Sequence, residues 1–202
     1  MHIEFLVEES SAEAALNNLA PAILGPDVTF QVHPYNGKPD LLAKLPDRLR
    51  GYRPWLPADW RIVVLLDADE ADCRQLKARM ETIAHAAGLT TRSAAGGAQF
   101  QVLNRLAVQE LEAWFFGDVE ALCAAYPRLD PNLAKRSRYR NPDAIAGGAW
   151  EALERELQRV GCAPGGLAKV ATARAVSEHM QPERNRSHSF QVFQQGLLEL
   201  IR

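Results

Sequence analysis

The sequence predicts an α/β protein with a mainly parallel sheet, flanked by helices and followed by a helical C-terminal extension. Short apolar segments alternate with longer segments of helical periodicity through the first half of the chain, which is the pattern of strand–helix–strand units. The segment 62–66, "IVVLL", contains only apolar side chains, as is typical of a central parallel strand that is covered on both faces. The 202 residues suffice for one core, or for one core with a small appendage.

The individual elements follow from periodicity and from helix-end signals. Strands are expected at 2–7, 28–35, 62–66 and 100–106. Helices are expected at 12–24, 36–52, 71–88, 148–160, 166–180 and 189–202, with a further helix after the fourth strand. Pro46 is expected to interrupt the second helix, because proline removes a backbone N–H donor and clashes with the preceding turn. Residues 1–125 should form the α/β part, and residues 126–202 a helical extension packed on the same core.

Carboxylates follow the ends of two predicted strands. Glu8 directly follows the first strand, and Asp67 and Asp69 follow the third. Because the carboxyl ends of parallel strands meet at one edge of a sheet, these side chains are expected to converge. Asp67 and Asp69 would point the same way if the strand geometry persists to its end. Such oxygen ligands suit Mg²⁺ or Mn²⁺, with Glu8 as a third ligand or as a general base.

The acidic residues also have a structural interpretation. Asp67 could cap the next helix, with the acids after it placed at the positive end of the helix dipole. That interpretation is favoured for Glu70 and Asp72. It is weaker for Asp67 and Asp69, because two carboxylates that leave a buried strand repel each other and lose solvation.

A second acidic pair follows the fourth predicted strand. Glu110 and Glu112 either complete a second metal site or supply charge at a helix entry, and the sequence leaves both interpretations open. The aromatic run after them, Trp114 to Phe116, is interpreted as core.

The segments "FLVEESSAE" and "VVLLDADEADC" carry a family resemblance. A strand ending in Glu, followed much later by a strand ending in D-x-D, resembles the Toprim domain of topoisomerases, primases and related nucleases. By this resemblance Glu8 takes the place of the Toprim glutamate, and Asp67 and Asp69 match its D-x-D. The resemblance implies Mg²⁺-dependent phosphodiester chemistry, as in a nuclease or nicking enzyme, with these three residues as catalytic groups. The chain departs from the pattern at Glu9, where Toprim sequences have Gly, so that Glu9 competes for the catalytic role.

A narrower resemblance spans nearly the whole chain. The segments "FLVEESSAEAAL", "HPYNGKPDLL", "ELEAWFFGD" and "ERNRSHSFQVF" resemble an uncharacterised bacterial Toprim-like family. Some of its members are similar to companions of ATPases in mobile-element or phage-defence gene clusters. This likeness implies, as an alternative to the nuclease, a non-catalytic binding or regulatory partner of an ATPase. A third interpretation, a receiver-like domain phosphorylated at Asp67, fits the C-terminal helices least.

Basic residues suggest a nucleic-acid partner. Charge runs usually form solvated faces, but two runs in a chain with a Toprim-like acidic site favour nucleic acid, and Tyr139 within the first run is suited to base stacking. Lys38 follows the second strand and would approach a substrate phosphate. The candidate nucleic-acid-binding residues are Lys38, Lys135, Arg136, Arg138, Arg140, Arg184 and Arg186.

Composition and missing motifs exclude several classes of protein and of functional site. A formal net charge of −2 argues against a histone-like grip on DNA. Three widely spaced cysteines suggest neither a disulfide framework nor a zinc site and fit a reducing cytoplasm. The N-terminal region lacks the pattern of a signal peptide, and no long apolar run predicts a membrane span. G-x-S-x-G, H-E-x-x-H, Walker A and Rossmann motifs are missing from the sequence.

Overall fold

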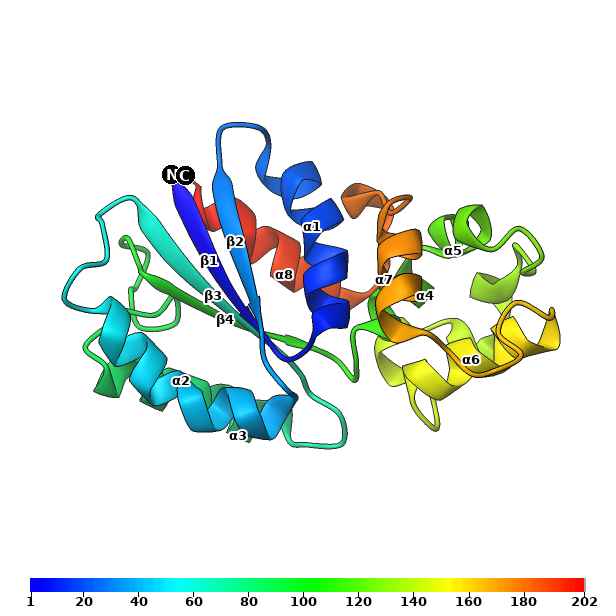
Figure 1. Ribbon diagram of the computed structural model, residues 1–202, viewed down its shortest axis with the longest axis horizontal. Helices are drawn as coiled ribbons and strands as arrows, with labels where there is room; N and C mark the ends of the chain where they lie inside the picture. Colours follow the sequence, from blue (N-terminus) through cyan, green and yellow to red (C-terminus); the bar gives the residue numbers. More distant parts are fainter. Residues whose placement is uncertain (202) are drawn as a thin grey trace.

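The computed structural model describes residues 1–201 and contains a four-stranded parallel sheet with helices on both faces (Figure 1). The fold class expected from the sequence is therefore confirmed. Neighbouring strands lie in the order β2–β1–β3–β4, and every pair is parallel. The strands are β1 (His2–Val7), β2 (Thr29–Pro34), β3 (Trp60–Asp67) and β4 (Val102–Ala107).

The helices form two groups. One group flanks the sheet, with α2 and α3 on one face and α1 and α8 on the other (Figure 1). The other group, α4 to α7, lies beyond the carboxyl ends of the strands. The helices are α1 (Ser10–Leu24), α2 (Lys38–Tyr52), α3 (Cys73–Ala86), α4 (Glu112–Gly117), α5 (Val119–Ala125), α6 (Ala149–Arg159), α7 (Lys169–Ser177) and α8 (His188–Leu200). Short 3₁₀ turns occupy Leu133–Lys135, Ser137–Tyr139, Pro142–Ala144 and Pro182–Arg184.

Strand β3 is covered on both faces, as its apolar run predicts. Ile62 and Leu66 belong to the apolar cluster under α2 and α3, whereas Val63 and Leu65 belong to the cluster on the α1 and α8 side. These side chains are essentially inaccessible to water. Burying each one stabilises the fold by roughly 1.5–3 kcal/mol, so β3 anchors both layers.

The expectation that Pro46 interrupts the second helix is wrong. Helix α2 continues through Pro46 from Lys38 to Tyr52. Its leucines at 41, 42, 45 and 49 are all buried against the sheet on both sides of the proline. Packing of an amphipathic face outweighs the loss of one backbone hydrogen bond, because tertiary contacts supply most of the stability of a helix.

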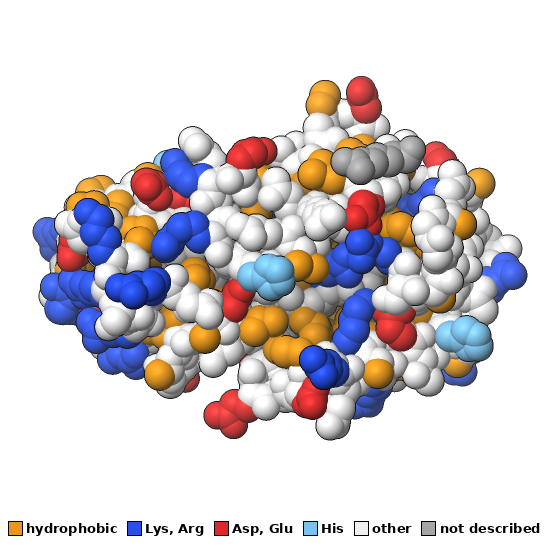
Figure 2. All heavy atoms as spheres, turned by 180° about the vertical axis from the view of Figure 1, so that it is seen from behind, with side chains coloured by type: hydrophobic (Ala, Val, Ile, Leu, Met, Phe, Trp, Pro, Cys, Tyr) orange, Lys and Arg blue, Asp and Glu red, His pale blue; other side chains and the backbone are white. Residues whose placement is uncertain are grey.

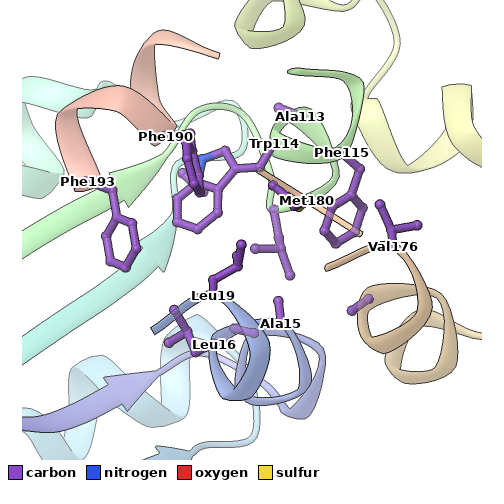
Figure 3. Close-up of a cluster of buried hydrophobic side chains, with 14 of the residues drawn as sticks. Ala15, Leu16, Leu19, Ala113, Trp114, Phe115, Val176, Met180, Phe190 and Phe193 are labelled. Atoms are coloured by element: carbon purple, nitrogen blue, oxygen red, sulfur yellow. The ribbon is translucent and has the colours of Figure 1, made fainter. Parts of the chain in front are cut away.

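A second part of the core joins the sheet to helices α4–α7 (Figure 3). Trp114 and Phe115 of α4 are fully buried, and Trp114 packs against Phe190 and Phe193 of α8, at ring-centroid separations of 5.2 and 4.9 Å. Helix α1 supplies Leu19 to the same cluster. The prediction that the aromatic run is core is confirmed. Of the helices described between residues 1 and 201, none combines the length and apolar character that a membrane span requires.

Candidate acidic site at the carboxyl ends of the strands

Five carboxylates meet beyond the carboxyl ends of β1 and β3, and we call them the acidic site. The backbone N–H of Asp67 donates to the Glu8 carboxylate at 3.2 Å, which joins the ends of the two strands directly. Four carboxylates lie close enough to Asp67 to oppose its ionisation. The members of the acidic site are Glu8, Glu9, Asp67, Asp69 and Glu112.

Asp67 and Asp69 differ in backbone and in exposure. Strand β3 ends at Asp67, which is partly buried, and Asp69 has a left-handed φ of 50° and an exposed side chain. The strand geometry therefore does not persist to Asp69, and the two carboxylates do not share one strand face. The N–H of Asp69 donates to the Gln109 carbonyl at 2.6 Å, which connects the loop after β3 to the loop after β4. Asp residues tolerate left-handed backbone better than most side chains.

The charge of the acidic site is incompletely compensated. Burial raises the pKa of the Asp67 carboxyl well above its usual range, and the carboxylates of Glu112, Glu8, Asp69 and Glu9 raise it further. Burial likewise raises the pKa of Glu112 to about 7, although Lys169 acts in the opposite direction. The pKa of Glu8 is also raised by burial, against hydrogen bonds from the backbone of Asp67 and the attraction of Lys38.

Two lysines flank the carboxylates. Lys38 begins α2, and its Nζ lies 2.5 Å from Asp69. Lys169 begins α7, with its Nζ 3.5 Å from Glu9 and 4.6 Å above the Trp150 ring. The sequence indicates Lys38 as a residue near the acids, but it offers no signal for Lys169, which follows them by more than fifty positions in the chain.

The second acidic pair is divided between two roles. Glu112, in the first turn of α4, faces the acidic site and is 2% exposed. Glu110 instead accepts a hydrogen bond from the Trp150 N–H at 2.8 Å, at the start of α6. A carboxylate there satisfies a free N–H and favours the helix dipole. For Glu110 the structure supports helix entry, although the helix is α6 rather than α4.

The neighbouring acids have the structural roles expected for them or lie in solvent. Asp72 caps α3, where its side chain accepts from the N–H groups of Arg74 and Gln75. Because α3 begins only after Asp72, five residues beyond the end of the strand, Asp67 does not cap this helix. Glu70 is exposed in the turn between them.

The donor set of the acidic site suits a hard cation. It contains carboxylate oxygens and no sulfur or imidazole, which is the chemistry that Mg²⁺ and Mn²⁺ take up. Within residues 1–201, no group of three His, Cys, Asp or Glu side chains is placed to hold a metal ion. Mg²⁺ commonly uses only one or two protein carboxylates and completes its shell with water and substrate phosphate. Asp67 and Glu112, both with raised pKa values, fit that mode of binding.

The first basic run surrounds a buried carboxylate. Arg136 and Arg138 both donate to Glu156 on α6, at 3.1 and 2.9 Å, and Arg159 joins them at 3.0 Å. Tyr139 donates its hydroxyl to the same carboxylate at 2.8 Å and is 1% exposed. The expectation that Tyr139 stacks on a base is wrong, because its ring stacks on Phe116 in the core.

In the second basic run, one arginine binds a buried carboxylate and the other is exposed. Arg184 forms two hydrogen bonds, at 2.8 and 3.0 Å, to Asp118, whose side chain is fully buried. Arg186 is exposed. Between them Asn185 lies against Gly117, where a β-carbon would collide with the Asn185 Oδ1, so this contact requires glycine. Asn185 and Arg186 therefore pack against Gly117 at the end of α4.

Fold and site define an α/β protein with a parallel sheet and an acidic site at its carboxyl edge. The chain matches the model of the family described as "Domain of unknown function (DUF4276)" over residues 7–198, and it belongs to that family. No curated protein matches the chain, and no solved structure does.

Proposed function

We propose that this protein cleaves phosphodiester bonds in nucleic acid with Mg²⁺ or Mn²⁺ as its cofactor. The observation that supports the proposal most is the convergence of Glu8, Asp67 and Glu112 with raised pKa values beside two lysines. Perturbed carboxylates that cluster at a strand edge are typical of catalytic sites. The resemblance of the Glu8 and Asp67–Asp69 segments to the Toprim pattern supports the same chemistry.

The residues divide the work by their surroundings. Asp67 and Glu112 would hold the cation, which when bound would polarise the phosphoryl group and lower the pKa of a water molecule. Glu8, whose raised pKa brings it nearer to neutral pH, would take the proton of the attacking water. Lys38 and Lys169 would bind the phosphate oxygens on either side of the acidic site.

A basic surface lies one helix length from the acidic site. Glu110 and Lys169 contact Trp150 at the start of α6, and the arginines gather near its end. The 11 residues of α6 span roughly 16 Å at about 1.5 Å per residue. We call this surface the arginine face, and its members are Lys135, Arg136, Arg138, Arg140, Arg155 and Arg159. Figure 2 shows Lys and Arg side chains gathered at the end of the molecule that α5 and α6 form. A strand that lies along α6 would bring a phosphate to the acidic site.

The arginine face predicts salt-dependent binding. Replacing both Arg140 and Arg155, which are exposed, by alanine should remove about two phosphate contacts, so that the slope of log Kd against log salt should fall by roughly two. Fluorescence anisotropy with labelled single-stranded and duplex DNA and with RNA measures this slope. Arg79→Ala, an exposed arginine on α3, is the matched control. An unchanged slope in the double variant would remove the arginine face from the proposal.

A cleavage assay tests the activity itself. The wild-type protein is incubated with single-stranded DNA, duplex DNA, nicked or supercoiled plasmid, and RNA, with Mg²⁺, Mn²⁺, Ca²⁺ or chelator. Cleavage that requires Mg²⁺ or Mn²⁺ and disappears with chelator is the expected result. Absence of cleavage on every substrate would overturn the proposed activity.

A non-catalytic partner of an ATPase is the second candidate function. The acidic site already contains two of its own counter-charges, since Lys38 pairs with Asp69 and Lys169 with Glu9. This observation favours a site that holds its shape without a metal ion. The candidate predicts that the wild type is inert in the cleavage assay. It also predicts that wild type and Asp67→Asn bind equally well to the product of a neighbouring gene in a pull-down.

A further inference from the structure

The outer edge of β4 has unpaired backbone groups. The N–H groups of Ile62 and Ala68 donate to the carbonyls of Gln101 and Ala107, so the odd-numbered residues of β4 bond to β3. The backbone groups of residues 104 and 106 therefore point away from the sheet. In the described part of the chain, no acceptor binds the N–H of Asn104 or of Leu106, and no donor binds the Leu106 carbonyl. The Asn104 carbonyl accepts from Lys77 and Arg105.

The chain itself begins a fifth strand at this edge and then leaves it. Thr91 forms a single parallel bridge with Val102, where the Val102 N–H donates to Thr90 and the Arg92 N–H donates to Val102. After Arg92 the chain turns away. The line of a fifth strand therefore continues past Asn104 and Leu106 without a chain in it.

A groove of about 480 Å³ lies along this open edge, between α3 and α8. Leu106, Val108 and Val192 give it an apolar surface, and Val192 is 36% exposed. Figure 2 views the molecule from this side and shows apolar side chains at the centre with Lys and Arg side chains near them. The apolar surface and Leu106 are thus partly exposed, whereas Asn104 is covered by its neighbours.

The lining of the groove is basic. Arg74 and His188 are exposed in it, and Asp143 is the one acid among the residues that line it. Lys77 also lines the groove but pairs with Glu81. Asp143 is already bound by Ser187 and Ser189. The Arg105 guanidinium is largely buried and donates to the backbone carbonyls of Asn104 and Val192.

One buried polar atom in the groove has no partner. Asn104 is 1% exposed, and its Oδ1 accepts no hydrogen bond from the residues that the structure describes. Its Nδ2 donates to Glu81 at 3.0 Å, which fixes the amide. A buried acceptor without a donor costs about 1–3 kcal/mol, and a ligand reaches this one only if the side chains that cover it move.

We propose that the edge of β4 binds an extended, acidic segment of another protein, which adds to the sheet as a fifth strand. Main-chain hydrogen bonds to Leu106 would give affinity, and pockets for alternate side chains would give specificity. A carboxylate of the segment would meet the exposed Arg74. This surface is separate from the acidic site, and the inference does not depend on the proposed cleavage.

A second copy of the chain fits this edge less well than an acidic segment does. Two copies paired through the same edge would place the same basic side chains opposite one another, which destabilises a pair. Lys77 also protects the edge against unspecific pairing, as lysines on edge strands do. Protection alone does not require an apolar groove beside the edge.

Binding of designed peptides tests the proposal. The probes are fluorescein-labelled peptides of alternating Glu and Val, the same peptide with Lys in place of Glu, and an N-methylated acidic peptide that cannot form a ladder. The acidic peptide should bind at least about tenfold more tightly than either control, which corresponds to about 1.4 kcal/mol. It should also slow hydrogen exchange at Leu106.

Matched variants locate the contact. Val192→Asp, at the groove, should weaken binding of the acidic peptide by about tenfold or more. Val170→Asp, at a similarly exposed valine on α7, should leave it unchanged. Equal binding of acidic and basic peptides, or no difference between the two variants, would overturn the proposal. Concentration-dependent dimerisation that Val192→Asp abolishes would also overturn it and assign the edge to a second copy.

Discussion

Asp67→Asn is expected to abolish metal-dependent cleavage and, in the absence of metal, to stabilise the fold. The loss of a charged ligand should lower the cleavage rate by about a hundredfold or more, the scale of single electrostatic groups in active sites. The gain in stability follows from the burial of Asp67 and from the four carboxylates, which all oppose its ionisation. A merely structural acid would give the opposite sign, because its removal would destabilise the chain.

The stability of the fold should depend on pH in a defined direction. Glu112 has a folded pKa of about 7 against an ordinary value of 4.5, so the folded chain binds this proton more tightly than the unfolded chain. Stability should therefore fall as the pH rises from about 4.5 to 7, by about 3 kcal/mol at roughly 1.4 kcal/mol per pH unit. Glu112→Gln should remove this loss, so that the variant is more stable than wild type above pH 7 and equal to it near pH 4.5.

Urea denaturation between pH 4.5 and 8, with and without Mg²⁺, measures the stability gain of Asp67→Asn and the pH-dependent loss that Glu112→Gln should remove. If the acidic site holds Mg²⁺ as proposed, the ion should stabilise the wild type, because that site exists only in the folded chain, and should have little effect on Asp67→Asn. Glu70→Gln, at an exposed acid in the same loop, is the control and should resemble wild type. A destabilised Asp67→Asn, or equal cleavage by that variant, would contradict the role given to Asp67.

Arg184→Met should be among the most destabilising single substitutions in the chain. It leaves the fully buried Asp118 carboxylate without the cation that binds it twice. Breaking a buried ion pair in this way costs about 3–5 kcal/mol. Asp118 also caps α5 and accepts from the Gln181 N–H, so the ion pair connects α5 to the segment before α8.

Thermal and urea unfolding measure this effect, and Arg186→Ala is the control two residues away. Arg186 is exposed, so its removal should cost less than about 1 kcal/mol. The double variant Asp118→Asn/Arg184→Met should recover part of the loss, since no buried charge then lacks a partner. If Arg184→Met reduced nucleic-acid binding but left stability unchanged, Arg184 would contact the ligand instead.

Local patterns in the sequence predict the fold well because strands and helices alternate with clear periodicity. They also predict that Glu8 and Asp67 meet, since parallel topology brings strand ends together. They do not predict Lys169 or the division between Glu110 and Glu112, because these depend on where α6 and α7 pack. Arg136 and Arg138 look like a solvated run, and only the position of Glu156 on α6 shows that a buried carboxylate binds them.

The packing of α8 has a consequence for biosynthesis. Phe190 and Phe193 complete the core around Trp114, and Arg105 of β4 lies against Gly196. Chains emerge from the ribosome from the N-terminus onward. The faces of Trp114 that Phe190 and Phe193 cover therefore stay uncovered until α8 has left the ribosome, so this part of the core is completed last.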